Sequence, residues 1–115
     1  MNLQNELYKN KSIDWHWTCI NHGLTENFMR EFKDYIDWRY ASRYQKMNVD
    51  FMREFKDKIN WVLISHYQIL TEDFMSEFEN KIYWNIISMC QCLSEDFIRK
   101  YSNFIDDFSY RTIKK

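Results

Sequence analysis

The chain has 115 residues, with one glycine, no proline and a formal net charge of −1 at pH 7. Because tight β-turns and phosphate-cradling loops depend on glycine and proline, this composition disfavours turn-rich β folds and excludes Rossmann-type and P-loop nucleotide sites. The near balance of acidic and basic residues removes any overall attraction to nucleic acid or to anionic membranes. Hydrophobic residues make up 45% of the chain, which is enough for the core of a single domain.

The ends of the chain and its cysteines bear on its location. Residues 1–12 are polar, so no secretory signal is expected, and no apolar run reaches the roughly 18–20 residues of a membrane span. The three cysteines, Cys19, Cys90 and Cys92, lack the spacing of a disulfide framework or a zinc knuckle. This usage fits a reducing compartment. We therefore predict a cytoplasmic protein with no membrane contact, no cofactor and no metal.

Isoleucine and aromatic residues recur along the chain at one fixed interval. Steps of 23 residues separate Ile13, Ile36, Ile59, Ile82 and Ile105, and likewise Trp15, Trp38, Trp61 and Trp84, and Phe28, Phe51, Phe74 and Phe97. Such an uninterrupted period marks a repeat protein. The predicted repeats are 13–35, 36–58, 59–81 and 82–104. The whole chain, 1–115, is assigned to one helical-repeat domain, with 1–12 as N-terminal cap and 105–115 as truncated C-terminal cap.

Two short helices are predicted in each repeat, whose positions we number from its isoleucine. Good helix-capping residues recur at positions 2 and 13. In chain order, the helices are expected to begin at Asp14, Thr25, Asp37, Asn48, Asn60, Thr71, Tyr83 and Ser94. Helices of about 8–11 residues are too short to be stable alone, so stacking must stabilise them. The predicted fold is all-α: a short α-solenoid of about four and a half two-helix repeats, with tryptophan and phenylalanine ladders in its core.

Residues at positions 7 and 10 are expected to connect neighbouring repeats. The serine or cysteine at position 7 would let neighbouring helices approach closely, and the ladder of Gln45, Gln68 and Gln91 at position 10 would satisfy backbone groups between repeats. Gly23 stands at position 11, where other repeats carry bulkier side chains, so no left-handed turn is expected there. The turns must therefore be made by cap residues.

Charged residues also recur, at positions 18 and 19. Within this pattern, Glu54 with Lys58 and Glu77 with Lys81 are i, i+4 pairs in the favourable order. Their recurrence predicts a solvated outer face of the helix that follows position 13.

The repeat unit I-[DN]-W-x-x-[IA]-S-x-x-Q-x-[LM]-[ST]-E-D-F-[MI]-R-E-F-K-D-K resembles a short repeat found in proteins of giant DNA viruses and some phages. Residues 59–61, 70–74 and 93–99 match it closely, and the resemblance covers almost the whole chain. The chain departs from the pattern at residues 47–49, where Val49 replaces the first-turn glutamate. The resemblance implies a viral origin and a helical-repeat fold, and it implies no catalytic residues. In period alone, the unit is also similar to leucine-rich-variant repeats.

Positions 4, 8 and 11 vary from repeat to repeat and are expected to lie opposite the tryptophan stripe. In a repeat protein, such positions are candidates for recognition, whereas recurring positions are structural. A plain solvent-exposed face is the alternative, but it would seldom carry Ile20, Val62, Ile69 and Met89. The candidate partner-binding residues are His16, Ile20, Arg39, Arg43, Lys46, Val62, His66, Ile69, Asn85 and Met89.

Three of these residues, Arg39, Arg43 and Lys46, form the main basic cluster, which Tyr40 and Tyr44 interleave. Helical-repeat proteins that recognise RNA use reading side chains in every repeat. Here the basic residues occupy mainly one repeat, which favours a solvated face or an acidic protein partner over nucleic acid.

Catalytic and metal-binding patterns are weak. Cys19 and His22 could be imagined as a nucleophile and its base, but no third group or oxyanion loop is indicated. His16, Cys19 and His22 span too wide an arc to ligate a metal from one helix face. His22 takes the place of the ladder glutamine, which indicates a packing role. We expect no enzymatic activity.

The sequence thus predicts a non-enzymatic protein-binding helical-repeat module of viral or phage origin. It would act by occluding a host protein, for instance a component of host defence. The main alternative is a nucleic-acid-binding repeat protein that uses Arg39, Arg43 and Lys46. A homo-oligomer, paired through the repeat ends or the exposed apolar positions, is a further alternative.

Overall fold

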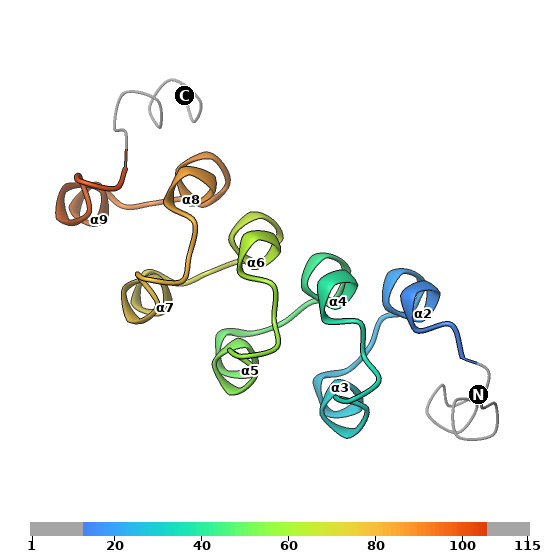
Figure 1. Cartoon of the computed structure of the whole chain (residues 1–115). Helices are drawn as coiled ribbons and strands as arrows, with labels where there is room; N and C mark the ends of the chain where they lie inside the picture. Colours follow the sequence, from blue (N-terminus) through green and yellow to red (C-terminus); the bar gives the residue numbers. More distant parts are fainter. Residues whose placement is uncertain (1–12, 106–115) are drawn as a thin grey trace.

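The computed structural model describes residues 13–105, and this part of the chain forms eight α-helices and no strand. The helices are α2 (Trp15–Asn21), α3 (Glu26–Glu31), α4 (Trp38–Tyr44), α5 (Val49–Glu54), α6 (Trp61–Tyr67), α7 (Glu72–Glu77), α8 (Trp84–Cys90) and α9 (Glu95–Lys100). Figure 1 shows them in two rows, with α2, α4, α6 and α8 in one and α3, α5, α7 and α9 in the other. The predicted all-α solenoid is confirmed. The two terminal caps predicted at 1–12 and 105–115 lie outside the described residues, apart from Ile105.

The molecule is elongated, with principal extents of 53 × 24 × 19 Å. Along the row of even-numbered helices, α2 packs against α4, α4 against α6, and α6 against α8. The odd-numbered helices are spread further apart, along the outer side of a gentle curve (Figure 1). The even-numbered helices therefore line the inner side of the solenoid.

The helices begin where the recurring cap residues predict. Asp14 accepts a hydrogen bond from the Trp17 N–H at 3.1 Å, and Thr25 accepts one from the Phe28 N–H at 3.0 Å. Equivalent bonds recur at the later helix starts, except at Tyr83, whose side chain makes no cap bond. Side-chain oxygens thus satisfy N–H groups that a helix start leaves unpaired.

The helices are shorter than the sequence predicted, with seven residues in α2 and six in α3. After α3 the chain continues in a turn, in which the Tyr35 and Ile36 N–H groups both donate to the Phe32 carbonyl oxygen at 2.9 Å. This turn keeps the apolar i, i+4 spacing without extending the helix. No described residue has positive φ, and that includes Gly23, as predicted. The repeats are therefore connected without left-handed backbone.

The core is a set of buried rows that run the length of the solenoid. Phe51 and Phe74 at position 16, and Met52 and Met75 at position 17, are fully buried. The tryptophan ladder agrees with the prediction only in part: Trp84 is buried in the core, whereas Trp15, Trp38 and Trp61 are half-buried and pack at its edge. The indole Nε1–H of Trp61 donates to the Lys56 carbonyl oxygen at 3.0 Å, and that of the buried Trp84 donates to the Glu79 carbonyl oxygen at the same distance. The polar end of the ring is therefore satisfied at both depths.

The glutamine ladder joins successive repeats, as predicted. Gln68 Nε2 donates to the Ser42 and Gln45 carbonyl oxygens of the preceding repeat at 2.9 and 2.6 Å. Its Oε1 accepts from the Met47 N–H at 3.1 Å. Gln45 and Gln91 repeat the pattern one step earlier and one step later. Each glutamine therefore satisfies the carbonyl groups at the end of the preceding even-numbered helix.

Serine at position 7 makes a second connection between repeats. Ser42 is fully buried, and its Oγ accepts from the Asn60 N–H at 3.0 Å while donating to the Trp38 carbonyl oxygen at 2.6 Å. Ser65 accepts in the same way from the Tyr83 N–H at 3.1 Å. The small side chain predicted for close approach thus also satisfies the backbone at the start of the next repeat.

Candidate protein-binding surface

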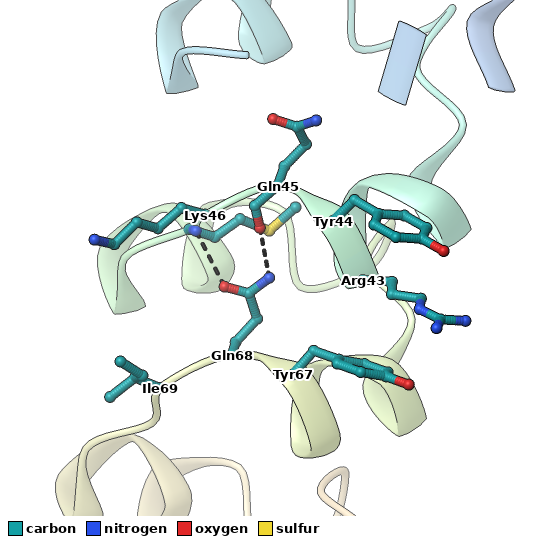
Figure 2. Close-up of a pocket in the computed structure, with 8 residues that line it drawn as sticks. Arg43, Tyr44, Gln45, Lys46, Tyr67, Gln68 and Ile69 are labelled. Carbon is teal, nitrogen blue, oxygen red and sulfur yellow. Dashed lines mark hydrogen bonds between the residues drawn. The ribbon is translucent and has the colours of Figure 1, made fainter. Parts of the chain in front are cut away.

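The structure exposes the side chains at positions 4, 8 and 11 in every described repeat. All ten candidate residues are exposed: His16, Ile20, Arg39, Arg43, Lys46, Val62, His66, Ile69, Asn85 and Met89. They lie on or directly after the even-numbered helices, whereas positions 6, 7 and 10 are buried or half-buried. The candidates therefore lie at exposed places along the row of even-numbered helices and the connections that follow them. In Figure 2, Arg43 extends with Tyr44 and Tyr67 to one side of the chain, and Lys46 and Ile69 extend to the other. Their role in binding stays a prediction.

Apolar side chains are prominent among these residues. Ile69 is 84% exposed, Met89 55%, Val62 40% and Ile20 39%. They come from α2, α6 and α8 and from the second residue after α6, so they recur along the row and are not one isolated side chain. Burial of these side chains against a partner would contribute about 25 cal/mol of stabilisation per Å² of apolar surface.

Three large aromatic side chains extend the same surface, and the sequence did not predict them as part of it. Trp17 is 55% exposed, Tyr44 44% and Tyr67 42%. They stand at positions 5 and 9, which flank the buried stripe on the helical wheel. The sequence feature that could have identified them is the aromatic residue that recurs at these flanking positions. We call the residues at positions 4, 8 and 11, together with Trp17, Tyr44 and Tyr67, the even-helix surface.

Arg43 is held between two tyrosines from successive repeats. Its Cζ lies 4.9 Å from the ring centroid of Tyr44 and 4.9 Å from that of Tyr67. Figure 2 shows the guanidinium between the two phenol rings, which extend on the same side of the chain. Cation–π attraction therefore holds the charge in a fixed place and still leaves it accessible to solvent. An open hollow of about 300 Å³ lies here, with Lys46 and Ile69 also among its lining residues.

Charges on the odd-numbered helices pair with one another. Arg30 Nε lies 2.9 Å from a carboxylate oxygen of Glu54, and Arg53 Nη2 lies 2.8 Å from one of Glu77, in each case one repeat further along. These bonds from Arg53 lower the pKa of the Glu77 carboxyl below its ordinary value. The sequence pattern instead suggested i, i+4 pairs of these glutamates with Lys58 and Lys81, and among the described residues no such ion pair is found. Planar arginine–carboxylate pairing explains the preference.

The basic residues of the even-helix surface are not neutralised in this way. Within residues 13–105, no carboxylate lies in ion-pair distance of Arg39, Arg43 or Lys46. We call these three residues the basic patch. Its charge is therefore available to an external anion.

The histidines have different surroundings. His16 Nε2 lies 2.5 Å from a carboxylate oxygen of Asp37 in the next repeat, and its ring centroid is 5.0 Å from that of Tyr40. His66 stacks on Tyr67 with ring centroids 4.0 Å apart. His22, at the glutamine position of the first repeat, is half-buried and meets the edge of Trp17 at 5.1 Å. These rings therefore add to the aromatic character of the surface.

Cys19, considered as a nucleophile, is fully buried. Burial raises the pKa of its thiol, an effect that the Asp37 N–H opposes by hydrogen bonding and the Asp37 charge reinforces. A raised pKa disfavours the reactive thiolate. Among residues 13–105, no three His, Cys, Asp or Glu side chains gather in a group that could hold a metal ion.

Comparison of the chain with protein-family models, with curated proteins and with solved structures gives no significant match. None of the described helices is both long and apolar enough to cross a membrane.

Proposed function

We propose that this chain is a non-enzymatic protein-binding module whose even-helix surface contacts the partner. The observation that carries the proposal is the exposure of Ile20, Val62, Ile69 and Met89 along the row of even-numbered helices. Exposed apolar side chains that recur along one surface are typical of interaction sites. Trp17, Tyr44 and Tyr67 add side chains of the kind that dominate binding energy in protein interfaces.

The contact surface is built on a preformed scaffold. Buried glutamine and serine side chains bond each repeat to the next, so the even-numbered helices hold their relative positions without a partner. A surface that is ordered before binding loses little conformational entropy on association. The module would act by covering a patch of its partner and excluding other ligands from it.

The expected viral or phage origin supports one version of this function. In that version, the partner is a host protein, for instance a component of host defence, and the encounter takes place in the host cytoplasm. The origin and the host partner rest on the resemblance of the repeat unit, whereas the cytoplasmic location rests also on the cysteine usage; all three stay predictions.

A nucleic-acid-binding function is the second candidate, and the accessible charge of the basic patch favours it. Binding to phosphates weakens steeply as salt rises, because condensed counterions are released. A titration of labelled single-stranded RNA and DNA at increasing salt tests this candidate. Absence of binding at low salt removes it.

Affinity capture from host-cell extract tests the protein-binding proposal. The test variant changes Ile20, Val62, Ile69 and Met89 to Asp. The matched control combines Lys33→Asp and Lys58→Asp, which lowers the net charge equally at exposed sites outside the even-helix surface. A partner captured by the wild-type chain and by the control, and lost from the test variant, supports the proposal. A partner that survives in the test variant contradicts the assignment of the surface.

A further inference from the structure

The even-helix surface has an uneven distribution of charge along its length. The basic patch lies in the second repeat, and apolar side chains stand on both sides of it: Ile20 in the first repeat, and Val62, Ile69 and Met89 in the third and fourth. The same surface in the third repeat carries no arginine or lysine. The pattern along the solenoid is therefore apolar, basic, apolar.

We propose that the partner of this surface is a protein segment with a central cluster of carboxylates and apolar side chains on both sides of the cluster. The inference rests on the proposed function and specifies its partner by chemistry. Carboxylates would meet the basic patch, and the flanking apolar groups would cover Ile20 at one end and Val62, Ile69 and Met89 at the other.

Charge complementarity is the first argument. The arginines of the odd-numbered helices already bind carboxylates of this chain, as Arg30 does with Glu54 and Arg53 with Glu77. The basic patch has no carboxylate partner within residues 13–105. Opposite charges across an interface steer association and select partners. Within residues 13–105, this accessible cluster of cations without a carboxylate partner therefore favours an acidic segment.

The placement of Arg43 is the second argument. The rings of Tyr44 and Tyr67 hold its guanidinium, with its Cζ 4.9 Å from each ring centroid (Figure 2). The side chain is therefore preorganised for two parallel hydrogen bonds to one carboxylate, which adds geometric specificity. Because the cation occupies a face of each ring, those faces do not serve as stacking platforms for bases.

The flanking residues favour protein over nucleic acid. A single-stranded nucleic acid follows a continuous basic groove, with aromatic side chains as stacking platforms along its path. Here the path beyond the basic patch meets Val62 and Ile69 in the next repeat and Met89 in the one after. Burial against apolar groups would stabilise those side chains, which have no charge or hydrogen-bond donor for a phosphate.

Selection from a displayed library of random peptides tests the inference on the full chain. Peptides of about 15 residues are suitable, because an extended chain of that length spans about 50 Å, close to the long axis of the molecule. Selected peptides are then labelled, and their dissociation constants are measured by fluorescence anisotropy, beside that of an oligothymidine of about 16 nucleotides.

Three variants complete the design. The charge variant carries Arg39→Glu, Arg43→Glu and Lys46→Glu. Its matched control carries Lys33→Glu, Lys58→Glu and Lys81→Glu, the same change in charge at exposed lysines outside the even-helix surface. The apolar variant carries Ile20→Asp, Val62→Asp, Ile69→Asp and Met89→Asp. Thermal unfolding of each variant confirms that it is folded.

The inference expects acidic peptides with apolar flanks, whose affinity falls about tenfold or more in the charge variant and in the apolar variant, and is retained in the control. Neutral or basic peptides that lose affinity only in the apolar variant overturn the inference and leave the proposed function standing. Failure to select any peptide, or peptides indifferent to both variants, overturns both. Oligothymidine that binds more tightly than every peptide and is lost in the charge variant overturns the inference in favour of nucleic acid.

Discussion

The Gln68 side chain binds the main chain of Gln45, its counterpart one repeat earlier, with Nε2 donating to the carbonyl oxygen at 2.6 Å. Both side chains are buried, and each closes the end of the helix before it. Because the interaction recurs at every described step between repeats, it connects four short helices into one continuous row. The even-helix surface depends on this row.

Replacement of Gln68 by Leu should destabilise the protein strongly. The change removes two donated bonds and one accepted bond at a buried site, leaving main-chain groups of the preceding repeat without partners. We expect a loss of about 3 kcal/mol in the free energy of unfolding, measured by urea titration. Lys46→Ala, at an exposed neighbouring site, is the control and should change it by less than about 0.5 kcal/mol. Equal values for the two variants would contradict the structural role of the ladder.

Position 7 should accept cysteine better than valine. Ser42→Val adds volume at a fully buried site and removes the acceptor for the Asn60 N–H, so a loss of about 2 kcal/mol is expected. Ser42→Cys keeps a small acceptor, and Cys19 already occupies this position in the first repeat beside the Asp37 N–H. Thermal melting of both variants decides the point. A valine variant as stable as the cysteine variant would show that the hydrogen bond is unimportant.

These internal connections could be predicted because each repeat of the chain can be compared with the others. A residue type that returns every 23 positions must serve the same neighbour each time, which identified the caps, the glutamine ladder and the exposed positions. It could not reveal the pairing of Arg53 with Glu77, because those residues are 24 positions apart and belong to different columns of the repeat. Hydropathy likewise concealed the exposure of Trp17 and Tyr67, since aromatic residues beside a buried stripe resemble core residues.

Glutamate in place of Val49, at position 14 of the second repeat, should restore a contact that this repeat lacks. Glu26 accepts from the N–H and the side-chain amide of Asn48 at 2.9 and 3.1 Å, and Glu72 binds Ser94 in the same way. Val49 stands at the equivalent position of the second repeat, and Thr71 stands in the third repeat where Asn48 and Ser94 stand in theirs. We expect Val49→Glu to be more stable than Val49→Ala by about 1 kcal/mol in urea unfolding, since both lose the valine packing and only one gains the bond. The opposite order would contradict this account.

The cysteines should differ in reactivity and in their effect on pH dependence. Cys92 is exposed, whereas Cys19 is buried with a raised thiol pKa. Iodoacetamide labelling followed by mass spectrometry should modify Cys19 more than about 100-fold more slowly than Cys92, because Cys19 becomes accessible only when the protein unfolds. Labelling of Cys19 as fast as Cys92 would refute its burial.

The raised thiol pKa of Cys19 should also make stability depend on pH. The thiol ionises at lower pH in the unfolded chain than in the folded chain, so the contribution of Cys19 to stability is complete below the ordinary thiol pKa of about 8.5 and declines as the pH rises beyond it. In Cys19→Ser, this decline of the free energy of unfolding at alkaline pH should be weaker.

The most direct measurement of the central claim is the dissociation constant of a purified partner or selected peptide, compared between three forms of the chain. They are the wild type, the variant with Ile20, Val62, Ile69 and Met89 changed to Asp, and the control with Lys33→Asp and Lys58→Asp. The account predicts a loss of about tenfold or more for the first variant, since several apolar contacts would be replaced by buried charges, and less than about threefold for the control. Equal affinities for all three forms would show that binding does not use the even-helix surface.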